Sequence, residues 1–314
     1  MNYKEFLIRV KENIQKYLPS EYAKSEPEII RRHVNNSENH YGITIRRMDK
    51  NIAPLLDLAP YYKMFENGTA FDSILRKLAA TYYIRDTETP TLCAEDFLYD
   101  NVKDKIFVKV CNAEKNKKQL ANAPHELKGD VALKYYIRGD KAADETIQIN
   151  IHKGYLELWN ITEEELKEQA WSNMRNLDYP VIIKISHLLE SYEEEELGEQ
   201  ELSDSGLYLL TNSRNRYGAS YAFDEKVMEL ISTTLNDDVV IIPSSVNEAL
   251  FISKKIVEEY EVQRGIKALI EEINVKYLRD EEFLSNEIYM YDRNTHQFSI
   301  IDVSEQEMGM SMNM

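Results

Sequence analysis

The chain has 314 residues, a formal net charge of −17 and a hydrophobic content of 43%. This length suits one large or two modest domains, and the apolar content is sufficient for a core. The negative charge argues against direct binding to nucleic acid or to an anionic membrane surface, because both contacts need clustered Lys and Arg. It is compatible with a basic protein partner.

The two cysteines, Cys93 and Cys111, are too few for a disulfide framework, and no CxxC spacing is present. We therefore expect reduced thiols, no metal site and no cofactor. The N-terminal stretch lacks the continuous apolar core of a signal peptide, and no segment approaches the ~20 apolar residues of a membrane span. These features predict a cytoplasmic protein, and they leave its oligomeric state open.

Apolar periodicity predicts mixed helices and strands in the first part of the chain. Pro19 ends the first helix, and Thr69 is a candidate N-cap for the helix over 71–82. In chain order we expect a helix over 6–18, a hairpin of strands 29–34 and 41–48, a helical turn at 55–59, a helix over 71–82, a helical stretch over 94–101 and a strand over 106–110.

The second part continues the same mixture. Thr162 and Glu165 form the sequence pattern of a capping box, which starts a helix. The acidic run 190–204 is typical of a solvated segment and is also a candidate docking surface. The other expected elements are strands over 131–137, 146–151 and 181–185, a helix over 257–273 and a closing hairpin of strands 287–292 and 297–302.

The stretch 207–253 is the most patterned part of the sequence. It predicts, in order, a strand, a turn, a helix capped by Asp224, a strand, a tight turn and a strand. The four consecutive apolar residues Val239–Ile242 indicate a strand that is covered on both faces.

Polar side chains follow two strands of this stretch and form our candidate ligand-binding surface. A helix joins the strands that begin at Leu207 and Val239, a connection that commonly makes strands parallel neighbours with their carboxyl ends at one edge. In the competing interpretations the strands are antiparallel, or these residues are only turn formers. The candidate residues are Asn212, Asn215, Ser220, Ser244, Ser245, Asn247 and Glu248.

No established catalytic motif accompanies these residues. The sequence contains no phosphate-binding loop, no GxGxxG, no HExxH and no GxSxG. A Ser–His–acid arrangement would need His125, His152 or His187 to approach through the fold, and nothing in the sequence favours it. The catalytic residues are therefore unknown at this stage, and whether the protein is an enzyme stays open.

Several motifs resemble a bacterial family of unknown function that is common in anaerobic Gram-positive bacteria. The similar segments run from YGITIRR through LWNITEEELKEQAWSNM, LYLLTNSRNRYGAS and IIPSSVNEALFI to LRDEEFLSNEIYMYD. Two of them are also distantly similar to a second uncharacterised bacillary family, in which the place of Asn247 tends to hold a polar or acidic residue or His. The resemblance implies an intracellular bacterial protein, and it supplies no catalytic residues.

Together these patterns predict an α+β fold with mixed, largely antiparallel sheets and packed helices. We expect an N-terminal region over 1–123, a C-terminal region with the central motif over 124–303, and a frayed tail over 304–314. Our first functional hypothesis is a non-enzymatic protein-interaction module with an acidic surface, for which a phage or mobile-element origin is one option. The alternative is a small-molecule-binding or hydrolytic enzyme that uses the polar strand ends.

Overall fold

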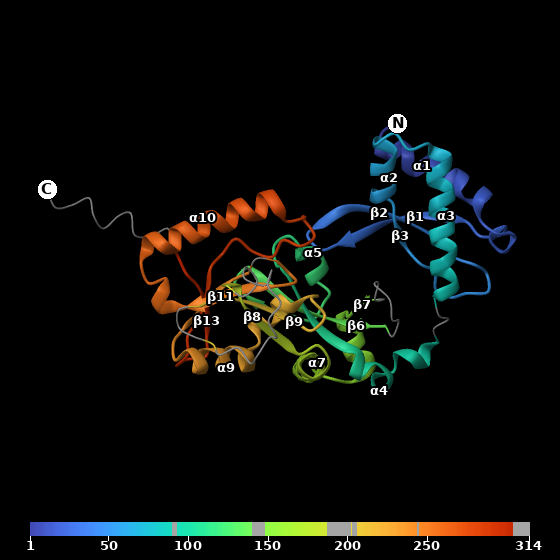
Figure 1. Ribbon diagram of the computed structural model, residues 1–314. Coiled ribbons are helices and arrows are strands. Elements are labelled where there is room, and N and C mark those ends of the chain that lie inside the picture. Colours follow the sequence, from blue (N-terminus) through green and yellow to red (C-terminus); the bar gives the residue numbers. More distant parts are fainter. Residues whose placement is uncertain (90–92, 140–147, 187–201, 203–205, 244, 304–314) are drawn as a thin grey trace, which may run out of the picture. The chain divides into compact units, whose positions relative to one another are not determined.

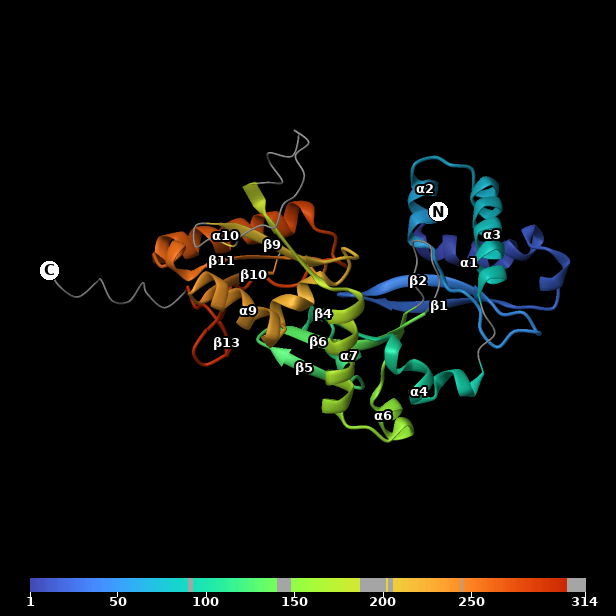
Figure 2. The same ribbon diagram turned by 60° about the horizontal axis from the view of Figure 1, so that its bottom comes forward.

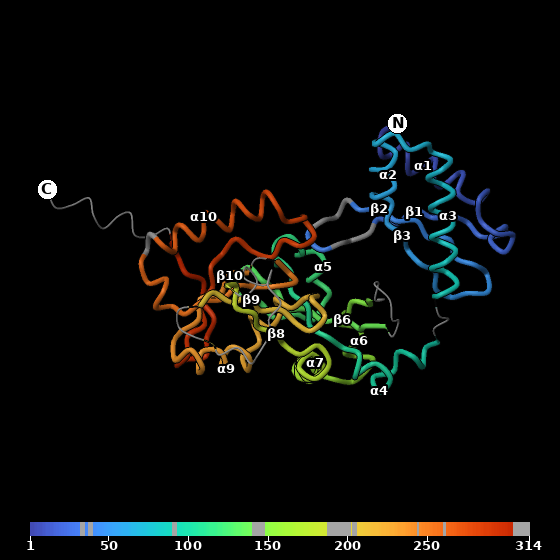
Figure 3. Tube along the Cα trace, viewed as in Figure 1, coloured from blue at the N-terminus to red at the C-terminus, as the bar shows by residue number. Residues whose placement is uncertain are grey.

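We describe the protein from a computed structural model, in residues 1–89, 93–139, 148–186, 202, 206–243 and 245–303 (Figure 3). The chain forms two compact units, Met1–Leu98 and Tyr99–Met314. The first boundary thus falls earlier than the expected one near Pro124. The reason is that β4 (Ile106–Asn112) pairs along its whole length with β6 (Val131–Arg138), across the expected boundary.

Unit 1 packs helices against a small antiparallel sheet of order β1-β2-β3 (Figure 1). Its core is made by apolar faces such as Phe6 and Val10 of the first helix and Leu78 and Tyr82 of the long third helix. The elements are α1 (Tyr3–Asn13), β1 (Pro27–Val34), β2 (Ser37–Ile45), β3 (Leu56–Asp57), α2 (Ala59–Glu66) and α3 (Phe71–Glu88).

Two local predictions in unit 1 are wrong. The segment predicted as a helical turn contains β3, because Leu56 and Asp57 pair with Ile43 and Gly42 of β2. Gly42 permits this approach, since a Cβ there would lie 2.7 Å from a methyl carbon of Leu55. Thr69 is not the N-cap of α3 either, because the helix begins one residue later and Ala70 occupies the cap without a side-chain hydrogen bond.

Unit 2 begins with a four-stranded sheet in which β6 pairs with β4, β5 and β7. Helix α7 (Glu163–Leu177) lies across this sheet, as Figure 2 shows. The predicted capping box is confirmed, since the Thr162 backbone N–H donates to the Glu165 carboxylate at 2.8 Å and the Glu165 N–H donates back at 3.2 Å. The shorter elements here are β5 (His125–Lys128), β7 (Gln148–Asn150), α4 (Tyr99–Val102), α5 (Lys117–Leu120) and α6 (Lys153–Trp159).

A six-stranded sheet of order β13-β12-β10-β11-β9-β8 completes unit 2. Figure 1 shows α10 on one face of this sheet and α9 on the other, so side chains that alternate along β10 contact different helices. The elements are β8 (Pro180–Lys184), β9 (Leu207–Asn212), η5 (Gly218–Phe223), α9 (Glu225–Leu235), β10 (Val239–Ile242), β11 (Ala249–Ser253), α10 (Tyr260–Tyr277), β12 (Tyr289–Tyr291) and β13 (Phe298–Ile300).

The predicted fold class is confirmed, because helices pack on three sheets in the described residues and every strand pair there is antiparallel. The predicted order of elements in the stretch 207–253 is also confirmed, and Val239–Ile242 is a buried strand. The acidic run lies outside the described residues except for Leu202, and so does the predicted tail. Across the described ranges, no helix has the length and apolar character to cross a bilayer.

Candidate functional site

Two lysines occupy directly opposed positions in the middle of a buried sheet. Lys109 of β4 is the register partner of Lys134 of β6, and their side chains are only 8% and 6% exposed. Because side chains alternate along a strand, Cys111 shares this face, while Val108 and Val110 point to the opposite face and join the main core. The sheet therefore places two cationic side chains next to each other on one face.

The Lys109 amine is held by amides and enclosed by aromatic rings. Its Nζ donates to Asn150 Oδ1 at 2.7 Å and to Gln148 Oε1 at 3.4 Å, both on β7. The ring centroids of Tyr136 and Tyr217 lie 4.9 Å and 5.7 Å from this nitrogen. The rings exclude water, and the two amide oxygens fix the position of the amine.

Lys134 has a different set of neighbours. Its Nζ donates to Gln119 Oε1 at 3.3 Å, and it also lies beside the thiol of Cys111. Burial raises the pKa of this thiol, although Lys134 and Lys109 act in the opposite direction. Cys111 is therefore a neutral thiol near neutral pH, and it does not supply the missing negative charge.

Neither lysine forms an ion pair with a carboxylate in the part of the chain that the structure describes. Like charges on directly opposed strand positions destabilise a sheet, and an unpaired buried charge is costly. Burial, with a further contribution from Lys134, lowers the pKa of the Lys109 amine to about 7. A substantial fraction of Lys109 is therefore neutral near pH 7, which is unusual for a lysine.

A loop over 213–217 brings Tyr217 to this cluster, and Asn212 holds the loop. The Asn212 side chain donates to Arg216 O at 2.8 Å and accepts from the backbone N–H groups of Arg214 and Arg216. Asn247 accepts from the Tyr217 N–H at 3.2 Å, and Tyr217 itself has a positive φ of 56°. Two of the predicted site residues thus position Tyr217 and Arg216 against Lys109.

The carboxyl ends of β9 and β10 lie at one edge of the sheet, but the predicted neighbour relation of these strands is wrong, and the polar ligand-binding surface stays a prediction. Strands β9 and β10 are parallel, yet β11 lies between them and pairs antiparallel with both. The carboxyl ends of β9 and β10 therefore flank the start of β11, where Asn247 hydrogen-bonds Thr211 and Tyr217 on one side and Ser245 on the other. The connecting helix does not make β9 and β10 adjacent, because β11 inserts between them.

Among the remaining predicted site residues, Ser245, Glu248 and Asn215 take part in local turns. Ser245 Oγ accepts from the Asn247 N–H at 3.1 Å, and its own N–H donates to Glu248 O. Asn215 is exposed with a φ of 51°, which suits a turn. Ser220 is fully buried, and its hydroxyl has no hydrogen-bond partner in the described residues. Ser244 lies outside those residues.

Gly218 allows the two polar clusters to approach each other. A Cβ at this position would lie 2.5 Å from Thr211 Oγ1 and 2.6 Å from Asn247 O. The Thr211 hydroxyl donates to the same Asn247 carbonyl at 2.9 Å. A larger residue at position 218 would therefore push apart the loop that carries Tyr217.

Lys109 and Lys134, the central residues of the cluster, were not predicted from the sequence. The available signal was a single lysine within each of two strongly apolar strands, IFVKVCN and VALKYYI. A buried charged residue is rare unless it is paired, so each lysine was informative once its strand was known to be buried on both faces. The pairing of the two strands was not visible in the sequence.

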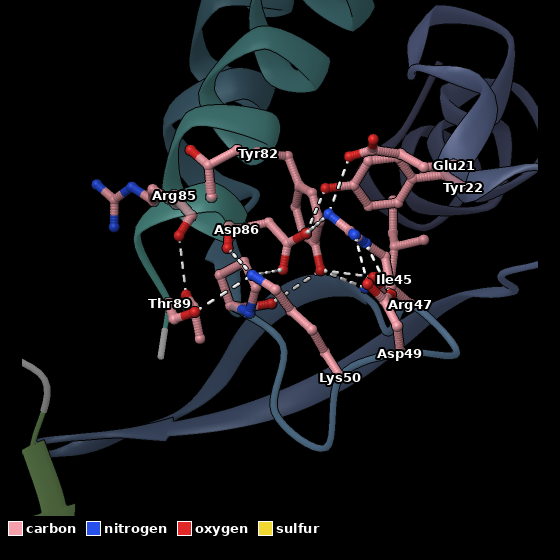
Figure 4. Close-up of polar contacts among 12 residues, drawn as sticks. Glu21, Tyr22, Ile45, Arg47, Asp49, Lys50, Tyr82, Arg85, Asp86 and Thr89 are labelled. Atoms are coloured by element: carbon pink, nitrogen blue, oxygen red, sulfur yellow. Dashed lines mark hydrogen bonds and ion pairs between the residues drawn. The ribbon is translucent and has the colours of Figure 1, made fainter. Parts of the chain in front are cut away.

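Unit 1 contains a second group of buried charges, and its charges are compensated (Figure 4). Asp86 is fully buried at the end of α3 and lies 3.4 Å from Lys50 Nζ and 3.7 Å from Arg47 Nη1. The Tyr22 hydroxyl donates to the same carboxylate at 2.5 Å, and burial together with Asp86 raises the pKa of this hydroxyl. We regard this cluster as structural, because each charged group already has a partner.

The fold and the cluster define an α+β protein whose second unit holds two opposed buried lysines, neither of which pairs with a carboxylate in the described residues. The model of a family described as "Family of unknown function (DUF5688)" matches residues 3–293, and the chain belongs to this family. No curated protein and no solved structure matches the chain.

Proposed function

We propose that unit 2 binds a small anionic compound, with Lys109 and Lys134 as its cationic ligands. The observation that carries this proposal is the opposed pair of buried lysines without a carboxylate partner in the described residues. An anion between the two amines would compensate both charges and would remove the energetic cost of their juxtaposition. It would bind tightly for its size, because electrostatic interactions strengthen away from water.

The surroundings of the pair support a ligand that is small. The amide oxygens of Asn150 and Gln148, the ring of Tyr217 and the guanidinium of Arg216 lie around Lys109. They offer a few fixed polar contacts and flat apolar surfaces, the combination typical of small-molecule sites. This role agrees with the small-molecule alternative drawn from the sequence, but it uses the polar strand ends as supports for the loop and not as ligands.

The interaction-module hypothesis depends on different residues. It rests on the net charge of −17 and on the acidic run 190–204, and that run lies outside the described residues apart from Leu202. The lysine pair is a cationic feature within a strongly acidic chain. For this reason we place anion binding first.

Calorimetric titration with inorganic phosphate and with small carboxylates tests the proposal. The wild-type chain should bind at least one of these anions, and Lys134→Gln should weaken that binding at least ten-fold. Lys226→Gln is the matched control, because Lys226 is an exposed lysine of the same unit and its loss changes the net charge equally. Equal affinities of all three proteins, or the absence of binding in the wild type, would refute the proposal.

A further inference from the structure

We propose that Lys109 is a nucleophile that forms a Schiff base with a 2-oxo acid, whose carboxylate is held by Lys134. This inference rests on the proposed anion site and names its substrate class. It is carried by the geometry of the cross-strand pair, which puts both lysines on one buried face, with the Lys109 amine against the amides of β7 and the Lys134 amine beside Gln119 and Cys111. In a 2-oxo acid the carboxylate and the reactive carbonyl carbon are directly bonded to each other.

The contacts of the Lys109 amine suit a nucleophile. A neutral amine has two N–H donors and one lone pair, and the structure provides two acceptors, Asn150 Oδ1 and Gln148 Oε1. The Tyr217 hydroxyl donates to the same Gln148 oxygen at 3.2 Å and so fixes this amide. When both N–H groups are engaged, the lone pair remains for attack on a carbonyl carbon.

The charge state of the amine is consistent with this role. The titratable or charged groups that face Lys109 are Lys134, Cys111, Tyr136, Tyr217 and Arg216. No carboxylate is among them in the described part of unit 2, and burial followed by Lys134 lowers the pKa of Lys109 to about 7. A lysine that is desolvated beside a second cation is a recognised form of activated nucleophile.

The chemical step balances without any further reagent. The amine lone pair of Lys109 attacks the carbonyl carbon, the π electrons move to the carbonyl oxygen, and a proton passes from nitrogen to that oxygen to give a carbinolamine. The carbinolamine then loses its hydroxyl group and the second amine hydrogen as water, and a carbon–nitrogen double bond forms. One amine and one 2-oxo acid thus yield one imine and one water molecule.

Reductive trapping tests the inference on the full-length wild-type chain. The protein is incubated with pyruvate and cyanoborohydride at pH 7, digested, and examined by peptide mass spectrometry. Hydride addition to the imine leaves a stable secondary amine, so the modified peptide gains the mass of pyruvic acid less one oxygen atom. We expect this adduct at Lys109 at more than ten times the level at exposed lysines such as Lys226.

Two variants and one substrate analogue distinguish failure of the Schiff-base inference from failure of the proposed anion site. Lys109→Arg keeps the positive charge and should abolish the adduct, while Lys134→Gln should reduce its yield at least ten-fold. Lactate resembles pyruvate but has no carbonyl, so it should bind to the same site without forming an adduct. Binding of pyruvate and lactate that depends on Lys134, without an adduct at Lys109, would overturn the Schiff-base inference and leave the anion site intact. The absence of binding by either compound would overturn the Schiff-base inference alone if phosphate still binds, and both proposals if phosphate does not bind either.

Discussion

Asp86 in unit 1 and Lys109 in unit 2 are both charged side chains in a protein interior, but their neighbours differ. Asp86 is approached by two cations and by a phenolic hydroxyl, so its charge is compensated within its own unit. Lys109 is approached by a second lysine, two amides and two aromatic rings. The first arrangement joins three chain segments. In the second, no carboxylate of the described residues compensates the charge of the lysines.

This difference separates structural charges from functional ones. A compensated buried ion pair is costly to break but provides no place for a ligand. An uncompensated buried group with a shifted pKa is a candidate functional residue, because the protein retains this group although its burial lowers the stability of the fold. Each of the following predictions tests one side of this contrast.

The largest effect is expected for Asp86→Ala. The substitution leaves Lys50 and Arg47 without their buried partner, so unit 1 should lose about 3–5 kcal/mol of stability. Hydrogen exchange of peptides from β2 and α3 measures this loss locally. Asp72→Ala on the same helix is the control, since Asp72 is exposed where it pairs with Arg76 and accepts from the Tyr17 hydroxyl, and its loss should have a much smaller effect. Similar losses in the two variants would contradict a structural role for Asp86.

Lys109→Met should stabilise unit 2 at low pH, which is opposite in sign to the effect of Asp86→Ala on unit 1. Below pH 7 the amine is protonated in both the folded and the unfolded chain, and its burial then destabilises the fold most. Between pH 7 and about 10 the unfolded chain retains a proton that the folded chain has lost, so wild-type stability rises by about 1.4 kcal/mol per pH unit from this group. The Met variant lacks this contribution, so it should be more stable than the wild type at pH 6, and its advantage should decline as the pH rises.

Tryptophan fluorescence during urea unfolding measures this effect in unit 2 alone. The only two tryptophans of the sequence, Trp159 and Trp171, are both in that unit and largely buried. The measurements need a buffer without phosphate or carboxylate, because a bound anion would stabilise the charged amine. A difference between the two proteins that is independent of pH would show that Lys109 has an ordinary pKa in the folded state.

A smaller effect is expected for Asn212→Ala, which releases the loop that carries Tyr217. Three hydrogen bonds to the backbone are lost, so unit 2 should lose about 1–3 kcal/mol. Anion affinity should fall as well, although Asn212 itself does not contact Lys109, and addition of Ser245→Ala should lower it further. The exposed neighbour Ser213→Ala serves as the control, and unchanged anion affinity in the double variant would place the site elsewhere.

The last predictions compare two tyrosine hydroxyls, and the smallest of all the expected effects is that of Tyr217→Phe. The Tyr22 hydroxyl donates to a carboxylate, so Tyr22→Phe should cost about 1.5–3 kcal/mol. The Tyr217 hydroxyl donates to the neutral amide of Gln148, so Tyr217→Phe should cost about 0.5–1.5 kcal/mol. Hydrogen exchange in unit 1 and fluorescence in unit 2 measure the two losses, and a larger loss at Tyr217 would reverse the proposed contrast.

Local patterns predicted much of the fold. The capping box at Thr162 and the buried strand Val239–Ile242 are encoded by adjacent residues, and both predictions are confirmed. The position of β11 between β9 and β10 depends on pairing between distant segments, so the neighbour relation of those strands was predicted wrongly.

The lysine pair was harder to predict for a related reason. Lys109 and Lys134 are 25 positions apart, and only the register of β4 with β6 makes them neighbours. The polar strand ends stood out in the sequence, but their side chains mainly hydrogen-bond the local backbone. Lys109 and Lys134 each lie within an otherwise largely apolar strand sequence. A single lysine in such a strand is a weaker sequence signal than a cluster of polar residues.

The most direct test of the central claim is a pH titration of Lys109 by carbon-13 NMR of labelled lysine side chains. We predict that the Cε signal of Lys109, assigned from Lys109→Arg, titrates near pH 7 in an anion-free buffer. Lys134→Gln should move this transition to higher pH, and a saturating anion such as phosphate should do the same in the wild type. A transition at the ordinary lysine value, unchanged by the anion and by Lys134→Gln, would contradict the account.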